Sequence, residues 1–210
     1  TQASGNNVVL NQPANDLVTA QANINIAVNR DRDWVRATNP TDSKADFVHT
    51  ANANIAATCN ATFNGSAINF YQAGGGCVNT AFSTVISHED GHWLNQIYGT
   101  GNGSDGMGEG NADVWGMYVW DTPVVGSGFT GGGSQIRSGL NTRQFCGDAN
   151  PGCYNGVHAN GEPWMGAAWK VRRNLKNTLG ATPGGLTANA LFLGWMNSYN
   201  QTQIRSVIET

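Results

Sequence analysis

Two histidines four residues apart flank a glutamate in the segment His88-Glu89-Asp90-Gly91-His92. Residues four apart lie on one face of a helix, so His88 and His92 can present two imidazoles to a single cation. Glu89 stands one position further round the helix, within reach of a water bound to that cation. The pattern is typical of zinc sites that activate water for hydrolysis. The alternative is a helix whose histidines only cap it or pack.

A catalytic zinc ion usually takes three protein ligands and keeps a fourth position for water. Glu109 is the candidate third ligand, because the sixteen residues between it and His92 allow one helix to end and a second to present its first turn. Asp113, four residues further on, shares the face of Glu109 and is placed to accept the outer N–H of His88 or His92. The alternative for Asp113 is an ordinary acid favoured by the helix dipole.

Two predicted helices carry these residues. Apolar positions recur at helical spacing over residues 80–98, and a second helix opens at 109–120 after a Gly-rich segment. A further amphipathic helix is predicted over residues 15–36, behind the candidate caps Asn15 and Asp16.

The remaining chain alternates short apolar runs with long loops. Residues 67–71 form an apolar-aromatic run between glycine-containing turns, which predicts a strand near a sheet edge. Residues 121–155 are rich in Gly, Ser and Asn and predict ordered loops, whereas 162–179 and 187–199 again favour helices.

The four cysteines fall into two local pairs, Cys59 with Cys77 and Cys146 with Cys153, and no Cys-x-x-Cys motif suggests a thiolate metal site. We expect two disulfides and an oxidising, extracellular compartment, the alternative being free buried thiols. The first residue, Thr1, fits a mature chain from which a leader and a pro-segment were removed, although a chain trimmed for expression would look the same.

The composition excludes two classes of partner. Charged residues make up 12% of the chain and its net charge is -3, so no basic patch is available for a phosphate backbone, and nucleic acid is excluded. No apolar run approaches the length of about eighteen residues that crosses a bilayer, so we expect a soluble protein without membrane contact. The 210 residues suit a single unit with two lobes, 1–98 including the zinc-binding helix and 99–210 mainly helical.

The motif His88-Glu89-x-x-His92, followed by Gly-Met-Gly-Glu-Gly-Asn-Ala-Asp at residues 106–113, resembles the fungalysin family. These relatives of thermolysin have a glutamate as third zinc ligand in a similar Gly-Met-Gly-Glu-Gly setting. Residues 28–34 are similar to a fungalysin N-terminal helix, and the resemblance extends over most of the chain. It implies an α+β thermolysin-like fold, with an edge strand in a mixed N-terminal lobe, a mainly helical C-terminal lobe and zinc in the cleft between them.

Three more segments carry the resemblance and imply further site residues. The segment starting Asn60-Ala61 looks like the edge segment that holds the substrate peptide, Arg137 looks like the arginine beside the primed-side pocket, and His158 looks like the histidine that stabilises the tetrahedral intermediate. The alternatives are a turn or glycosylated residue for Asn60 and a surface cation for Arg137.

Two positions depart from the family pattern. Cys153 stands where the family has an Asp five residues before its intermediate-stabilising histidine, so what orients His158 is open. The catalytic Tyr of the family has no aligned counterpart, and Tyr98 is the only Tyr between His92 and Glu109.

These observations predict a secreted, zinc-dependent endopeptidase in which Glu89 takes a proton from the attacking water and passes it to the leaving amine. We expect polypeptide substrates, a monomer, and a zymogen whose removed pro-segment binds the same site; calcium is not derivable from the residues. An aminopeptidase shares the zinc site but needs an acidic anchor, and no Gly-x-Met-Glu-Asn-type segment precedes His88. An inactive binding module is the other alternative, but Glu89 and all three candidate ligands are present.

Overall fold

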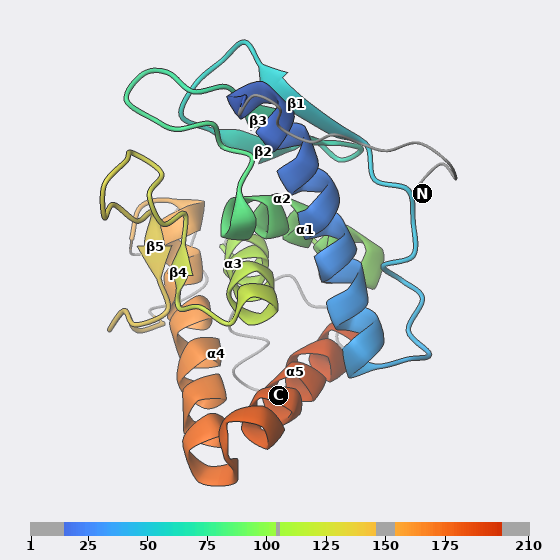
Figure 1. The fold of residues 1–210 in the computed structure, drawn as a ribbon. Coiled ribbons are helices and arrows are strands. Elements are labelled where there is room, and N and C mark those ends of the chain that lie inside the picture. The colour runs from blue at the N-terminus through green and yellow to red at the C-terminus, as the bar shows by residue number, and fades with distance from the viewer. Residues whose placement is uncertain (1–14, 104–105, 146–153, 199–210) are drawn as a thin grey trace.

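The computed structural model describes residues 15–103, 106–145 and 154–198. Within these ranges the chain forms five helices, a three-stranded sheet and a two-stranded sheet, which confirms the predicted α+β class. Figure 1 shows the larger sheet at one end of the molecule and a V of two C-terminal helices at the other, with two central helices between them.

Helix α1 (Asp16–Thr38) confirms the first predicted helix. Its N-cap is Asn15, whose side chain accepts the backbone N–H groups of Leu17 and Val18, so Asp16 is the first helical residue and not the cap. The buried positions recur every three or four residues and face the sheet and the central helices. They are Ala20, Ile24, Ala27, Asp31 and Val35.

The larger sheet consists of β1 (Ala51–Ile55), β2 (Ala61–Phe63) and β3 (Ile68–Tyr71) in the order β1-β3-β2. The prediction of a strand at 67–71 is confirmed, but its expected place at an edge is wrong. β3 lies in the centre, which explains why Ile68 and Phe70 are fully buried. Strand β2, which follows Asn60, forms one edge of this sheet.

Helices α2 (Ser83–Tyr98) and α3 (Met107–Trp120) confirm the two central helices. They cross closely because Gly91 faces α3; a Cβ there would lie 2.9 Å from the Cα of Ala112. α2 ends at Gly99, which adopts φ 86° and donates its N–H to the carbonyl of Asn95.

The last two helices, α4 (Val157–Leu179) and α5 (Ala181–Ser198), begin five and six residues before the predicted starts at 162 and 187. Pro163, which is typical of a first turn, lies inside α4, and the run Pro183-Gly184-Gly185, which resembles a helix breaker, lies in the first turns of α5, where Pro183 requires no N–H partner. His158 therefore lies on the first turn of α4 and not on a loop.

The segment predicted as loops, 121–155, contains one short hairpin in its described part. β4 (Val124–Val125) pairs antiparallel with β5 (Arg137–Ser138), which brings Arg137 back towards the central helices. The predicted Cys59–Cys77 disulfide is present. The predicted Cys146–Cys153 pair lies outside the described residues.

Helix α2 belongs to both hydrophobic cores. Val85 and Ile86 pack with α1 and the larger sheet, whereas Leu94 and Tyr98 pack with α3, α4 and α5. Packing on both sides makes α2 a rigid platform for the side chains that it presents. Among the described residues, no helix is both long and apolar enough to cross a membrane.

Candidate metal centre

The three predicted ligands converge at the junction of α2 and α3. The Nε2 atoms of His88 and His92 lie 3.3 and 3.5 Å from Oε2 of Glu109. One ligand atom from each residue lies within 4.8 Å of the other two. The helix spacing of α2 and the first turn of α3 thus bring together side chains seventeen residues apart.

The two separations that involve Glu109 fit a small tetrahedral cation. Ligand atoms held about 2.0–2.2 Å from zinc are about 3.3–3.5 Å from one another, the separation seen at Glu109. Oε2 of Glu109 is buried and has no partner of hydrogen-bond geometry among the described residues. A buried carboxylate oxygen without such a partner is costly unless a cation occupies the space before it.

The glycines around Glu109 are required by close contacts. A Cβ on Gly108 would lie 2.6 Å from the Cα of Asn102, and one on Gly110 would lie 2.7 Å from the carbonyl oxygen of Gly161. Gly106, which precedes α3, adopts φ 97°. The Gly-Met-Gly-Glu-Gly pattern therefore lets α3 begin close to α2 and α4, with Glu109 facing the histidines.

Asp113 contacts the Nδ1 side of the His88 ring. Its Oδ1 lies 2.8 Å from Nδ1 of His88, so Nε2 of the same ring faces Glu109. Arg137 donates from Nε to Oδ2 of Asp113 at 2.7 Å and from Nη2 to Oδ1 at 2.8 Å. Asp113 thus lies beside a candidate ligand histidine, and Arg137 is the bidentate partner of this carboxylate.

Asn102 supports His92 in the same way, and the sequence analysis missed it. The side-chain oxygen of Asn102 lies 2.9 Å from Nδ1 of His92, and its amide donates to the His92 carbonyl at 3.1 Å. Asn95 donates from its amide to the Asn102 oxygen and to the carbonyl of Gly108. Nδ1 of both candidate ligand histidines thus faces an acceptor oxygen, which leaves each Nε2 for a cation.

The charges of the cluster reflect its acidic surroundings. Burial lowers the pKa of His88, but Asp113 and Glu109 outweigh this effect and raise it to about 10. Burial likewise opposes ionisation of the two acids, yet Arg137 and His88 hold the pKa of Asp113 at about 2, and the contacts with His88 and His92 hold the pKa of Glu109 well below its usual range. Two ionised carboxylates beside these imidazoles give a site that attracts positive charge.

Glu89 lies beside the candidate ligands and lines a cleft. It lines two cavities, of about 400 and 320 Å³, that also share Asn60, Ala61, His88 and His158. Its side chain is directed into this space, although the residue is only 6% exposed. Burial raises the pKa of Glu89, and Glu109 adds to the effect, while His88 and His92 oppose it.

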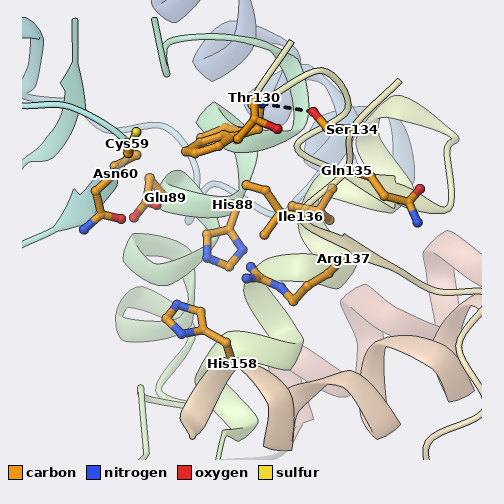
Figure 2. Close-up of a pocket in the computed structure, with 14 residues that line it drawn as sticks. Cys59, Asn60, His88, Glu89, Thr130, Ser134, Gln135, Ile136, Arg137 and His158 are labelled. Atoms are coloured by element: carbon orange, nitrogen blue, oxygen red, sulfur yellow. Dashed lines mark hydrogen bonds between the residues drawn. The ribbon is translucent and has the colours of Figure 1, made fainter. Parts of the chain in front are cut away.

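The remaining predicted residues line the walls of this cleft. Figure 2 shows Asn60 on one side and Arg137 and His158 on the other. Nε2 of His158 lies 3.4 Å from Oε2 of Glu109, but the metal-ligand group does not include His158, whose side chain is 60% exposed. Burial lowers the pKa of His158 more than Glu109 raises it.

The sequence left open the role of Tyr98 and the effect of Cys153 in place of the family Asp. Tyr98 packs its ring against Trp115 and donates its hydroxyl to Oδ2 of Asp42, so it belongs to the core and does not line the cleft. Cys153, the residue in place of the family Asp near His158, lies outside the described residues.

The chain was compared with known proteins. No protein-family model matches it, and no curated protein sequence matches it.

Proposed function

We propose that this chain is a secreted zinc-dependent endopeptidase with a thermolysin-like fold, related to the fungalysins. One observation carries the proposal. The candidate ligand group His88, His92 and Glu109 and the carboxylate of Glu89 face one cleft, and the wall of that cleft includes the edge strand β2. A metal group, a base and a place for an extended peptide are the parts that metal-assisted peptide hydrolysis requires.

Zinc is the metal that this donor set favours, because two imidazoles and one carboxylate are typical of catalytic zinc sites in peptidases. When bound, zinc supplies a Lewis acid that polarises the scissile carbonyl and lowers the pKa of the attacking water. The chain offers no thiolate at this group, which would favour a structural site instead.

Glu89 is the proposed proton carrier. Glu89 lies next to the proposed ligand His88 on α2 and faces the cleft. Its pKa is raised towards neutral pH, and a general base works best when its pKa is near the operating pH. Its carboxylate takes the proton of the attacking water and delivers it to the nitrogen of the leaving amine. No covalent acyl-enzyme forms, because the nucleophile is water.

The strand edge is the proposed peptide site. Within the described residues β2 pairs only with β3, so its other edge is available to an extended peptide. Asn60 and Ala61 lie at the start of β2 and line both cavities. His158, on the opposite wall, is placed to donate a hydrogen bond to the oxyanion, and Arg137 lies beside it.

The Cys59–Cys77 disulfide supports the secreted location, because disulfides persist in oxidising compartments. We further propose that the protein acts on polypeptide substrates, is a monomer, and is made with a pro-segment that binds the same site.

Digestion of a peptide library, with cleavage sites identified by mass spectrometry, tests this function. We expect internal cleavage that stops when zinc is chelated and returns when zinc is restored. Release of single N-terminal residues would indicate an aminopeptidase instead. Internal cleavage that survives complete removal of metal, or no cleavage at all by zinc-loaded protein, would refute the proposal.

A further inference from the structure

The Cys59–Cys77 disulfide lies at the wall of the larger cavity. Cys59 lines this cavity and immediately precedes Asn60. Its partner Cys77 lies in the loop of residues 72–82, which follows strand β3 and leads into α2. We call residues 72–82 the connecting loop. The disulfide therefore joins the peptide-binding wall to this loop.

The connecting loop packs tightly against the segment before Asn60. A Cβ on Gly74 would lie 2.7 Å from Cγ2 of Thr58, and one on Gly75 would lie 2.9 Å from its Oγ1. Gly74 and Cys77 also exchange two backbone hydrogen bonds, of 3.0 and 2.9 Å. This tight turn holds Cys77 close to Cys59.

A second connection runs from the same loop to Asn60. The hydroxyl of Thr80 donates to the carbonyl oxygen of Asn60 at 3.0 Å and accepts the N–H of Tyr71 at 2.8 Å. Thr80 is fully buried. The position of the Asn60 backbone therefore depends on the connecting loop.

The connecting loop also supports the opposite wall of the cavity. The N–H of Val78, next to Cys77, donates to the carbonyl of Phe129 at 3.0 Å, and the rings of Phe82 and Phe129 lie 6.4 Å apart. Phe129 belongs to the loop 126–136, whose residues Thr130, Ser134 and Ile136 line the cavity in Figure 2. Four glycines of this loop have positive φ, and backbone hydrogen bonds such as that from the N–H of Gly128 to the carbonyl of Ser134 at 2.7 Å hold its turns.

We propose that the Cys59–Cys77 disulfide braces the two walls of the cavity and thereby positions them for peptide binding. The inference rests on the proposed peptidase function and adds a positioning role for the disulfide. Without the bond, the connecting loop moves relative to Cys59, and both Asn60 and Phe129 lose a fixed support. Peptide binding then has to order both walls, which weakens it. The metal group is unaffected, because α2 and α3 hold its ligands.

The test separates peptide binding from catalysis by using the Glu89→Gln protein. The variant Cys59→Ala/Cys77→Ala in that background is compared with the disulfide-intact form. The probe is a dansyl-labelled peptide with leucine and phenylalanine at its centre, chosen because Val85, Val125 and Ile136 line the cavity. Binding is followed by fluorescence and zinc by elemental analysis. We expect about tenfold weaker binding at unchanged zinc content.

A second measurement uses the active protein. The same double substitution should raise KM about tenfold while kcat changes little, since it alters the ordering of the peptide site and not the chemistry. Thr80→Val breaks the hydroxyl link to Asn60 but keeps the disulfide, and it should weaken peptide binding in the same direction. Thr80→Ser retains the hydroxyl and should bind the peptide nearly as well as the parent.

Unchanged peptide binding in the double variant, with zinc retained, would overturn the proposal that the disulfide braces the two walls. Should that variant fail to fold or lose zinc, the folded Glu89→Gln protein is reduced with tris(2-carboxyethyl)phosphine and measured again, with its Cys146→Ala/Cys153→Ala form as control: weaker peptide binding with zinc intact supports the proposed brace, and unchanged binding overturns it. A disulfide-intact Glu89→Gln protein that holds zinc but binds no peptide would refute the peptidase proposal itself and the brace with it.

Discussion

The side-chain oxygen of Asn102 lies 2.9 Å from Nδ1 of His92, ten residues earlier in the chain. The side-chain amide of Asn102 also donates to the backbone carbonyl of His92, and the side-chain amide of Asn95 donates to the side-chain oxygen of Asn102. The imidazole of His92 is thereby held with Nε2 towards Glu109, as Asp113 holds the imidazole of His88. Each of the two candidate ligand histidines has its own acceptor, an amide oxygen for His92 and a carboxylate for His88.

Replacing Asn102 by alanine should lower zinc affinity about 10–100-fold, because the His92 ring loses the acceptor that orients it. Competition with a fluorescent zinc chelator measures the effect. Asn102→Asp keeps an acceptor oxygen at this position and should retain most of the affinity. Zinc binding by Asn102→Ala as tight as that of the unsubstituted protein would show that Asn102 does not position His92.

Arg137 should matter for stability as well as for the cleft. Its guanidinium is the bidentate partner of the fully buried Asp113, so Arg137→Ala removes both of these hydrogen bonds and leaves the buried carboxylate with His88 alone. Breaking a buried pair in this way costs about 3–5 kcal/mol, which denaturant unfolding of the zinc-loaded protein measures. Arg137→Lys keeps the charge but not the two parallel hydrogen bonds, and should lose less. An Arg137→Ala variant with unchanged stability and a raised KM would show that Arg137 acts only by contacting the substrate.

Local spacing explains which parts of the site could be predicted from the sequence. His88, Glu89 and His92 depend on the periodicity of one helix, and Glu109 lies in the first turn of the next, so few long-range contacts are needed to place them. The glycines beside Glu109 were informative because each is required by a close backbone contact, such as that of Gly108 with Asn102.

The missed features depend on contacts between distant segments. Asn102 has no distinguishing pattern in an Asn-rich chain, and only its place in the Gly-rich loop before Glu109 was a signal. β1 and β2 are five and three residues long and contain little apolar periodicity, so the sheet could not be recognised, and β3 was wrongly placed at its edge. The start of α4 was missed because Gly161 resembles a breaker and Pro163 a first-turn residue, while the packing of Gly161 against α3 overrides its low propensity.

Glu89→Gln should retain zinc and the fold and lose most peptidase activity. The amide has nearly the same shape as the carboxylate but cannot accept the proton of the attacking water. Peptide turnover and zinc content, measured on one preparation, separate the two roles. Substantial turnover by the variant would remove Glu89 from the mechanism, and loss of zinc would make its role structural.

His158→Ala should lower kcat about a hundredfold to a thousandfold while KM and zinc content change little, because a donor to the oxyanion acts mainly in the transition state. The exposure of His158 and its place outside the ligand group agree with this role. Steady-state kinetics on a peptide substrate and elemental analysis are the measurements. Full activity would make His158 an incidental helix residue, whereas loss of zinc would make it a ligand.

The most direct test of the account is a crystal structure of the protein purified without added metal, with anomalous diffraction recorded on both sides of the zinc absorption edge. We predict one strong zinc peak per chain, bonded to Nε2 of His88, Nε2 of His92 and the carboxylate of Glu109 at about 2.0–2.2 Å. A metal held by a different set of residues, or a peak that persists below the zinc edge at full strength, would contradict the zinc site on which the proposed function depends.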